Sequence, residues 1–148
     1  MRRILVVAHK TLGGEQLLEE VRSRRQAGEC SFHLLVPVDH PHGVAWSEGQ
    51  AQAAAQRVLD EGLARLRHDD AAGTTSFTGE VGDVNPVHAV RYLLFRGDRF
   101  DEVILSTLPA GPSRWLRADV PHRMERELAA DDIPMVHIIG AEDRSHAE

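Results

Sequence analysis

Two stretches of the chain concentrate side chains that can hold a negatively charged group. The first contains Ala8, His9 and Lys10, and the second runs from Ser106 to Arg123. Candidate contact residues in the second stretch are Ser106, Thr107, Gly111, Ser113, Arg114, Arg117, His122 and Arg123. Proteins bind phosphate-like anions with the N–H groups of small-residue turns, with hydroxyls and with guanidinium groups. These residue types therefore predict an anion site.

Local helical turns would organise the second stretch. Ser113 and Asp119 can each cap a turn, and a turn after Ser113 would bring Arg114 and Arg117 onto one face, because residues three apart are neighbours on a helix. The alternative is that these arginines are solvated surface residues and that Trp115 packs over the core. The concentration of such side chains in one stretch favours the anion site.

Continuous apolar runs alternate with segments of helical spacing along the chain. The apolar runs are residues 4–8, 32–36, 102–106 and 134–139, and residues 74–81 are Thr-rich and alternate weakly, as expected of an edge strand. Buried strands joined by helices are typical of a parallel sheet with right-handed crossovers. We therefore expect one α/β domain over residues 1–148, doubly wound and Rossmann-like, with a five-stranded parallel sheet and helices on both faces.

This sheet determines where a ligand can bind. Open doubly wound sheets bind ligands beyond the carboxyl ends of the strands, where the strand order reverses. The two stretches directly follow or overlap the ends of runs 4–8 and 102–106. We therefore expect the site between the loops after the first and fourth strands.

Composition limits the partners and the location of the protein. The formal net charge of −6 disfavours nucleic acid, which is bound through many Lys and Arg side chains. No apolar run approaches the about 20 residues of a membrane-spanning helix, so no membrane partner is expected. Cys30 is the only cysteine, and Met1 leads into run 4–8 without a cleavage-site pattern, which predicts a cytoplasmic protein without an internal disulfide.

Four segments carry a family resemblance. They are RILVVA (3–8), EVGDVNPVHAV (80–90), FDEVILS (100–106) and IPMVHI (133–138). In order and spacing they are similar to the universal stress protein family of the adenine-nucleotide α hydrolase-like (HUP) superfamily. This resemblance implies the strand order 3-2-1-4-5, a role in the stress response, binding of ATP or another adenine nucleotide, and a homodimer formed through the last strand.

The phosphate-binding loop of that family is altered in this chain. Family members that bind ATP carry Gly-x2-Gly-x9-Gly, followed by Ser or Thr, after strand four. Here Ser106 and Pro109 stand at the first two glycine positions, and Asp119 stands at the last. A carboxylate at Asp119 would repel a phosphate unless a neighbouring arginine neutralised it. The chain thus resembles a divergent member whose anion or nucleotide loop is completed by His9 and Lys10.

Three other functions compete with ligand binding. No metal site is expected, because Asp39, His40 and His42 form one loop cluster without a distant fourth ligand. A nucleotide-processing enzyme of the same superfamily is an alternative, but its usual His-x-Gly-His and Ser-Gly-Gly sets are missing after the first strand, and no catalytic residue is assigned. The remaining alternative is a ligand-free dimeric interaction module that pairs through run 134–139.

Overall fold

Strands and helices alternate along the chain as the sequence predicts. The computed structural model describes residues 1–40, 45–109 and 113–140. In chain order the elements are β1 (Arg2–Val7), α1 (Glu15–Ala27), β2 (Cys30–Pro37), α2 (Glu48–Asp69), β3 (Ser76–Gly82), α3 (Pro86–Arg96), β4 (Glu102–Thr107), α4 (Arg114–Arg117), α5 (Val120–Ala129) and β5 (Met135–Ile139). Each predicted strand is therefore present.

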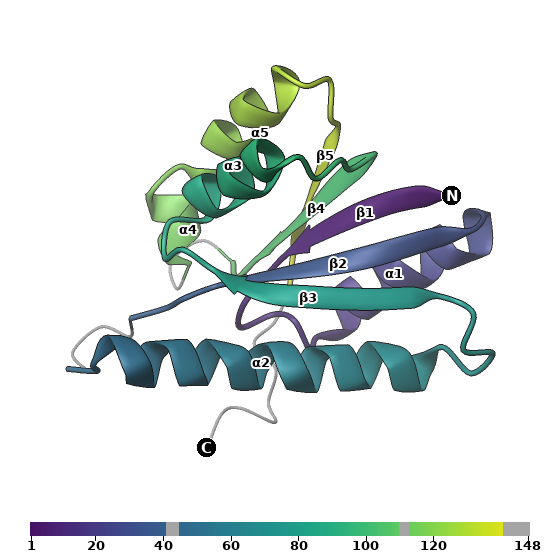
Figure 1. Ribbon diagram of the computed structural model, residues 1–148, viewed down its shortest axis with the longest axis horizontal. Coiled ribbons are helices and arrows are strands. Elements are labelled where there is room, and N and C mark those ends of the chain that lie inside the picture. The colour runs from purple at the N-terminus through teal and green to yellow at the C-terminus, as the bar shows by residue number, and fades with distance from the viewer. Residues whose placement is uncertain (41–44, 110–112, 141–148) are drawn as a thin grey trace.

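The strands form one parallel sheet with the order β3-β2-β1-β4-β5 (Figure 1). This confirms the expected fold class and strand order. β1 is central, with Val6 opposite Leu34 of β2 and Ile104 of β4. The chain moves outward from β1 to β3 and then returns to β4, so right-handed crossovers place α1 and α2 on one face and α3 and α5 on the other.

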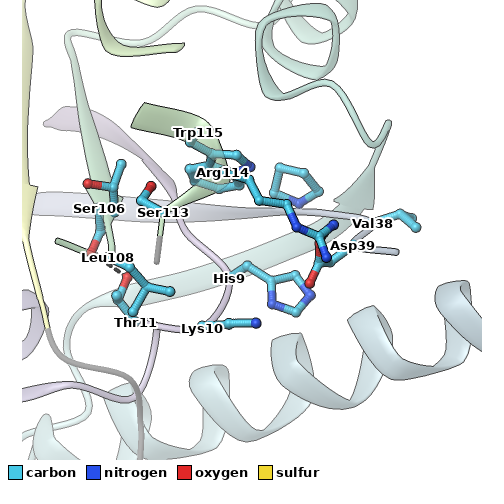
Figure 2. Close-up of a pocket in the computed structure, with 12 residues that line it drawn as sticks. His9, Lys10, Thr11, Val38, Asp39, Ser106, Leu108, Ser113, Arg114 and Trp115 are labelled. Atoms are coloured by element: carbon cyan, nitrogen blue, oxygen red, sulfur yellow. Dashed lines mark hydrogen bonds and ion pairs between the residues drawn. The ribbon is translucent and has the colours of Figure 1, made fainter. Parts of the chain in front are cut away.

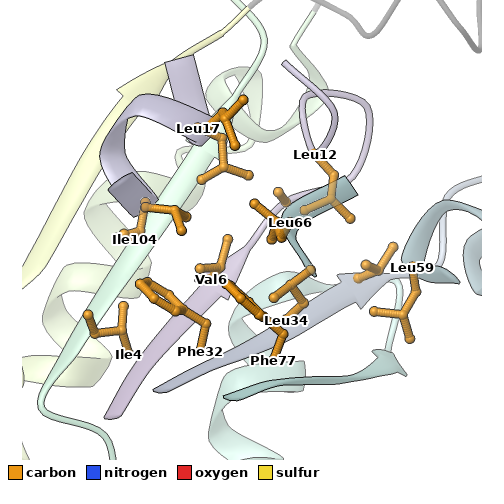
Figure 3. Packing of buried hydrophobic residues seen from close by; sticks show 14 of the residues in the cluster. Ile4, Val6, Leu12, Leu17, Phe32, Leu34, Leu59, Leu66, Phe77 and Ile104 are labelled. Atoms are coloured by element: carbon orange, nitrogen blue, oxygen red, sulfur yellow. The ribbon is translucent and has the colours of Figure 1, made fainter. Parts of the chain in front are cut away.

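Apolar side chains fill the space on both faces of the sheet. Ile4 and Val6 of β1 face α1 and α2, in the cluster shown in Figure 3. Leu5 and Val7 of the same strand pack in the second cluster, beneath α3 and α5. Successive side chains of a strand point to opposite faces. A strand covered on both faces must therefore be apolar at every position, which explains the continuous apolar run.

The two edge strands are less buried than the centre of the sheet. β3 pairs only with β2 and alternates buried and exposed positions near its start, where Phe77 stacks on Phe32 with ring centroids 5.4 Å apart. β5 pairs only with β4, and most of its side chains are half-buried. Ile139 at its end is 53% exposed. This pattern fits edge strands, which have a neighbour on one side only.

Polar side chains cap the helices that begin at the carboxyl edge of the sheet. Ser47 starts α2 with a capping box, and the Oδ1 atom of Asn85 accepts hydrogen bonds from the N–H groups of Val87 and His88 at the start of α3. The expectation that Asp119 caps α5 is wrong. Its backbone is left-handed, at φ 57° and ψ 35°, and its side chain makes no capping hydrogen bond, because such a bond needs extended backbone at the cap.

An ion-pair cluster joins three elements at the opposite edge of the sheet, where the strands begin. The carboxylate of Glu102 on β4 accepts hydrogen bonds from Arg24 of α1 and Arg2 of β1, each at 2.9 Å. The hydrogen bond from Arg24 is the main cause that lowers the pKa of Glu102 below its ordinary value. Because this cluster lies far from the carboxyl ends of the strands, its role is structural.

Candidate functional site

A cavity of about 70 Å³ opens where the strand order reverses between β1 and β4 (Figure 2). It lies beyond the carboxyl ends of the central strands, the edge where open α/β sheets bind ligands. Its described lining residues are His9, Lys10, Thr11, Pro37, Val38, Asp39, Ser106, Thr107, Leu108, Ser113, Arg114 and Trp115. The cavity is thus built from the ends of β1, β2 and β4 together with α4.

The loop after β1 is held on two sides. The Oγ1 atom of Thr11 lies 2.5 Å from Oγ of Ser106, and this buried hydrogen bond joins the loop to the end of β4. A β-carbon added at Gly62 would lie 2.4 Å from Cδ2 of Leu12, so the loop packs directly on the backbone of α2. Lys10 is exposed and forms no ion pair with any described residue. Its ammonium group is therefore available to a ligand.

The short helix α4 brings a hydroxyl and a guanidinium group to the cavity. Ser113 is buried, and its Oγ atom accepts a hydrogen bond from the N–H group of Leu116 at 3.1 Å, which confirms the predicted cap. The Nη1 atom of Arg114 lies 3.2 Å from Oδ1 of Asp39 and also donates to the carbonyl oxygen of His40. Arg114 therefore links α4 to the loop after β2 beside the cavity (Figure 2).

Charge in the lining favours an anion. The described part of the lining contains one lysine, Lys10, one arginine, Arg114, and one carboxylate, that of Asp39. Arg114 is shared, because an entering anion would compete with Asp39 for its guanidinium group. A cavity that holds more fixed positive than negative charge attracts anionic ligands.

The size of the cavity limits what can enter it completely. A buried water molecule needs roughly 10–15 Å³ of cavity volume, so the cavity of about 70 Å³ has room for about five water molecules. This is comparable to one phosphate group, whereas pockets that enclose a whole drug-sized ligand measure about 300–1,000 Å³. A nucleotide could place a phosphate here, and its sugar and base would lie outside this cavity.

The hydroxyl of Thr107 contacts the neighbouring strand. Its Oγ1 atom lies 2.8 Å from Nε2 of His137 on β5. Burial lowers the pKa of His137 below its ordinary value, because the interior disfavours the charged imidazolium form. Thr107 thus lines the cavity at the end of β4 while its side chain is held by β5.

The structure brings together six of the residues that the sequence identifies as contacts. They are His9, Lys10, Ser106, Thr107, Ser113 and Arg114. Ala8 is buried in the core directly before them. Arg117, His122 and Arg123 lie in α4 and α5 and do not line the cavity, and Gly111 lies outside the described residues. Ligand contacts by these last four residues stay predictions.

Sequence reasoning did not select the other half of the lining. These residues are Thr11, Pro37, Val38, Asp39, Leu108 and Trp115. The end of the second strand carries a usable signal, because neighbouring parallel strands end at the same edge of a sheet. Asp39 follows that strand directly. Trp115 both lines the cavity and packs against the cluster under α3 and α5.

The described residues contain neither a metal centre nor a membrane-spanning helix. No group of three or more His, Cys, Asp or Glu side chains in this part of the chain is arranged to hold a metal ion. His42, one member of the loop cluster weighed as a metal ligand, lies outside the described residues. Within residues 1–40, 45–109 and 113–140, no helix has both the length and the apolar character needed to cross a membrane.

Comparisons with known proteins give structural matches. No protein-family model and no curated protein sequence matches the chain. A universal stress protein solved in complex with cAMP is similar over 95% of this chain and 98% of that chain, with a TM-score of 0.55 and 12% identity. An E. coli tRNA N6-threonylcarbamoyladenosine dehydratase solved with ATP is similar over 92% of this chain and 50% of that chain, with a TM-score of 0.50 and 14% identity.

A protein of the universal stress protein family from Burkholderia pseudomallei overlaps 93% of this chain and 95% of its own, with a TM-score of 0.48 and 17% identity. Identities this low establish similarity of fold. The sheet order and the similarity to the cAMP-bound protein over nearly the whole of both chains agree with the resemblance in sequence. The chain therefore has the fold of the universal stress proteins.

Proposed function

We propose that this protein binds a small phosphate-bearing ligand of the adenine-nucleotide class and acts as a regulatory protein. The ligand would bind between the loops after β1 and β4. One observation carries the proposal: Lys10, Arg114 and the hydroxyl-bearing Ser113 converge on a cavity the size of a phosphate group at the reversal of strand order. Charge-assisted hydrogen bonds from such groups are the usual means of holding phosphate.

The structural neighbours support the nucleotide class. The universal stress protein of similar fold is bound to cAMP, and the dehydratase is bound to ATP. Cyclic AMP carries a single phosphate, which agrees with the small volume of the cavity in this chain. We therefore expect AMP and cyclic AMP to bind at least as tightly as ATP, because only one phosphate group can enter the cavity.

Binding would require a local exchange of partners. Arg114 would turn part of its guanidinium group from Asp39 to the ligand, and Lys10 would approach from the loop after β1. The buried bond between Thr11 and Ser106 holds the base of the cavity in place during this exchange. The base of the cavity is thus preorganised, which reduces the cost of binding.

The test compares an arginine that lines the cavity with an exposed arginine that was not predicted to contact the ligand. Ligands released from the purified protein are identified by mass spectrometry, and AMP, cyclic AMP and ATP are titrated by calorimetry. We expect Arg114→Ala to weaken binding by about 1.5–3 kcal/mol, the range for a hydrogen bond to a charged group. Arg126→Ala removes the same charge from an exposed position on α5 outside the cavity and should have a much smaller effect. Equal losses in the two variants would contradict the proposed site.

The same preparations address turnover. A regulatory protein should bind the nucleotide without consuming it. Release of inorganic phosphate from ATP, at a rate above that of the buffer and lost in Arg114→Ala, would replace the regulatory proposal with a nucleotide-processing enzyme. A release rate that is unchanged in this variant would identify a contaminating activity.

The free edge of β5 favours a second candidate function, a homodimeric interaction module. Among the described residues, β5 pairs with β4 on one side only, and Ile139 at its end is half exposed. A strand with an unpaired edge can pair with a second copy of the chain. We expect light scattering after size-exclusion chromatography to show a dimer that Ile139→Lys dissociates. Phe95→Lys on the exposed face of α3 is the matched control, and dissociation by both variants would exclude a specific β5 interface.

A further inference from the structure

A second, larger cavity of about 470 Å³ opens beside the first. It lies between the beginning of α2, the carboxyl ends of β2 and β3, and α3. Its lining residues are Leu35, Val38, His40, Glu48, Gln52, Glu80, Val81, Gly82, Asp83, Val84, His88, Ala89, Tyr92 and Leu93. Val84 and Tyr92 are exposed and provide apolar surface, Leu35, Ala89 and Leu93 are buried beneath the lining, and Val38 lines both cavities. The volume lies within the about 300–1,000 Å³ typical of ligand pockets.

The charge in this cavity is opposite to that in the first. Among the described residues, its lining contains Glu48, Glu80 and Asp83 and no Lys or Arg. The hydrogen bond from Arg96 is the main cause that lowers the pKa of Glu80, so this carboxyl is ionised at neutral pH. Glu48 and Asp83 are exposed. Nε2 of His40 lies 3.6 Å from Oε1 of Glu48, and no Lys or Arg among the described residues pairs with either carboxylate. The lining therefore carries net negative charge.

Side chains of the protein already accept hydrogen bonds from backbone N–H groups at the two helix N-termini beside this cavity, so fewer of these groups are free to bind an anion. The N-terminus of a helix attracts negative charge through its free N–H groups. At α2, Oγ of Ser47 accepts from the N–H group of Gln50 at 3.2 Å. At α3, Oδ1 of Asn85 accepts from Val87 at 3.0 Å and from His88 at 3.3 Å. These internal caps leave the lining carboxylates as the main charges that a ligand meets.

The arrangement of the carboxylates indicates the shape of the ligand. No three potential metal ligands among the described residues converge on one point, so the carboxylates suit several separated positive charges better than one metal ion. The apolar surface between them suits a hydrocarbon chain. We propose that this cavity binds an aliphatic polyamine, with ammonium groups at Glu48 and Asp83 and methylene groups over Val84 and Tyr92. This inference does not depend on the proposed function.

The test is an NMR titration of the ¹⁵N-labelled full-length protein with spermidine at constant ionic strength. We expect saturable shifts of the amides of Gly82, Asp83 and Val84. Cadaverine should shift the same amides, and pentanediol, its uncharged analogue with the same carbon chain, should not. Magnesium chloride tests for simple charge attraction, and saturation of the same amides with equal affinity for magnesium would overturn the inference. Absence of any saturable shift with spermidine would also overturn it.

Matched variants distinguish the cavity from the general acidity of the chain. Glu48→Gln and Asp83→Asn should each weaken spermidine binding about twofold to fivefold, the effect of removing one exposed ion pair. Asparagine keeps the acceptor that Asp83 offers to the N–H group of Asn85, so the turn is retained. Glu125→Gln removes the same charge from an exposed position on α5. A loss in Glu125→Gln equal to that in the cavity variants would refute the assignment.

Discussion

Replacing Asp39 with Asn should strengthen anion binding, because Asp39 competes with the ligand for Arg114. The side chains of the pair are 40% exposed for Arg114 and 24% exposed for Asp39. A pair this exposed is worth about 0–1 kcal/mol, which is the cost of breaking it when a ligand enters. The Asp39 carboxylate would also repel the ligand, by about 0.8 kcal/mol for unit charges roughly 5 Å apart in water. These two effects partly overlap and are screened by salt, so we expect Asp39→Asn to gain about 1 kcal/mol of binding free energy, which corresponds to about fivefold tighter binding.

The assay for this prediction is a calorimetric or NMR titration of Asp39→Asn with AMP at low and high salt. The gain in affinity should shrink as salt rises, because screening weakens interactions between exposed charges. Asp131→Asn, at an exposed position after α5 near the opposite edge of the sheet, is the control for net charge. Weaker binding by Asp39→Asn would refute the reasoning, since it would mean that Asp39 holds Arg114 in its productive position.

Three further predictions concern stability. Glu102→Gln should lower the free energy of unfolding by about 2 kcal/mol at neutral pH. Because the pKa of Glu102 is depressed in the folded state, the stability that Glu102 contributes is lost as pH falls below about 4.5. Urea denaturation should therefore show a smaller loss of stability on acidification in the variant than in the original protein. The pKa of His137 is also lowered in the folded state, so on acidification the imidazole is protonated in the unfolded chain before it is protonated in the folded one. Stability therefore falls as pH drops below about 6.5. His137→Gln should reduce the difference in urea midpoint between neutral and mildly acidic buffer. Gly79→Ala would place a β-carbon 2.9 Å from the carbonyl oxygen of Leu34 and should lower the melting temperature, at a cost of about 1–3 kcal/mol; an unchanged melting temperature would show that β3 shifts freely.

The fold was predictable because its signals are local. A strand buried on both faces is apolar at every position, and a helix with one buried face repeats its apolar residues every three to four positions. β1 and α1 follow these rules closely, so their positions and the fold class could be deduced from the sequence. The strand order came from the family resemblance. Asp119 was misjudged as a cap because its left-handed backbone follows from how the chain leaves α4.

The site was predictable only where single loops determine it. Lys10 follows the first strand and Ser113 lies in the stretch after the fourth strand. The pattern of apolar residues identifies both strands, so the place of these two residues at the carboxyl edge of the sheet could be deduced. The contact between Arg114 and Asp39 spans 75 positions of sequence and depends on how α4 lies against the loop after β2. No local pattern encodes that approach. For the same reason, sequence patterns alone could not distinguish Arg114, which lines the cavity, from Arg117, which lies one turn away on α4.

Through Glu48 and through the contact between Gly62 and Leu12, α2 touches the surroundings of both cavities. α2 has 22 residues and is therefore about 33 Å long. Its first residue, Glu48, lines the second cavity, and its glycine at position 62 supports the loop that carries Lys10. A rigid helix moves as one body, so a ligand that shifts its beginning also shifts the support of that loop. Any such coupling must be reciprocal, and occupation of either cavity would then alter the affinity of the other by the same factor.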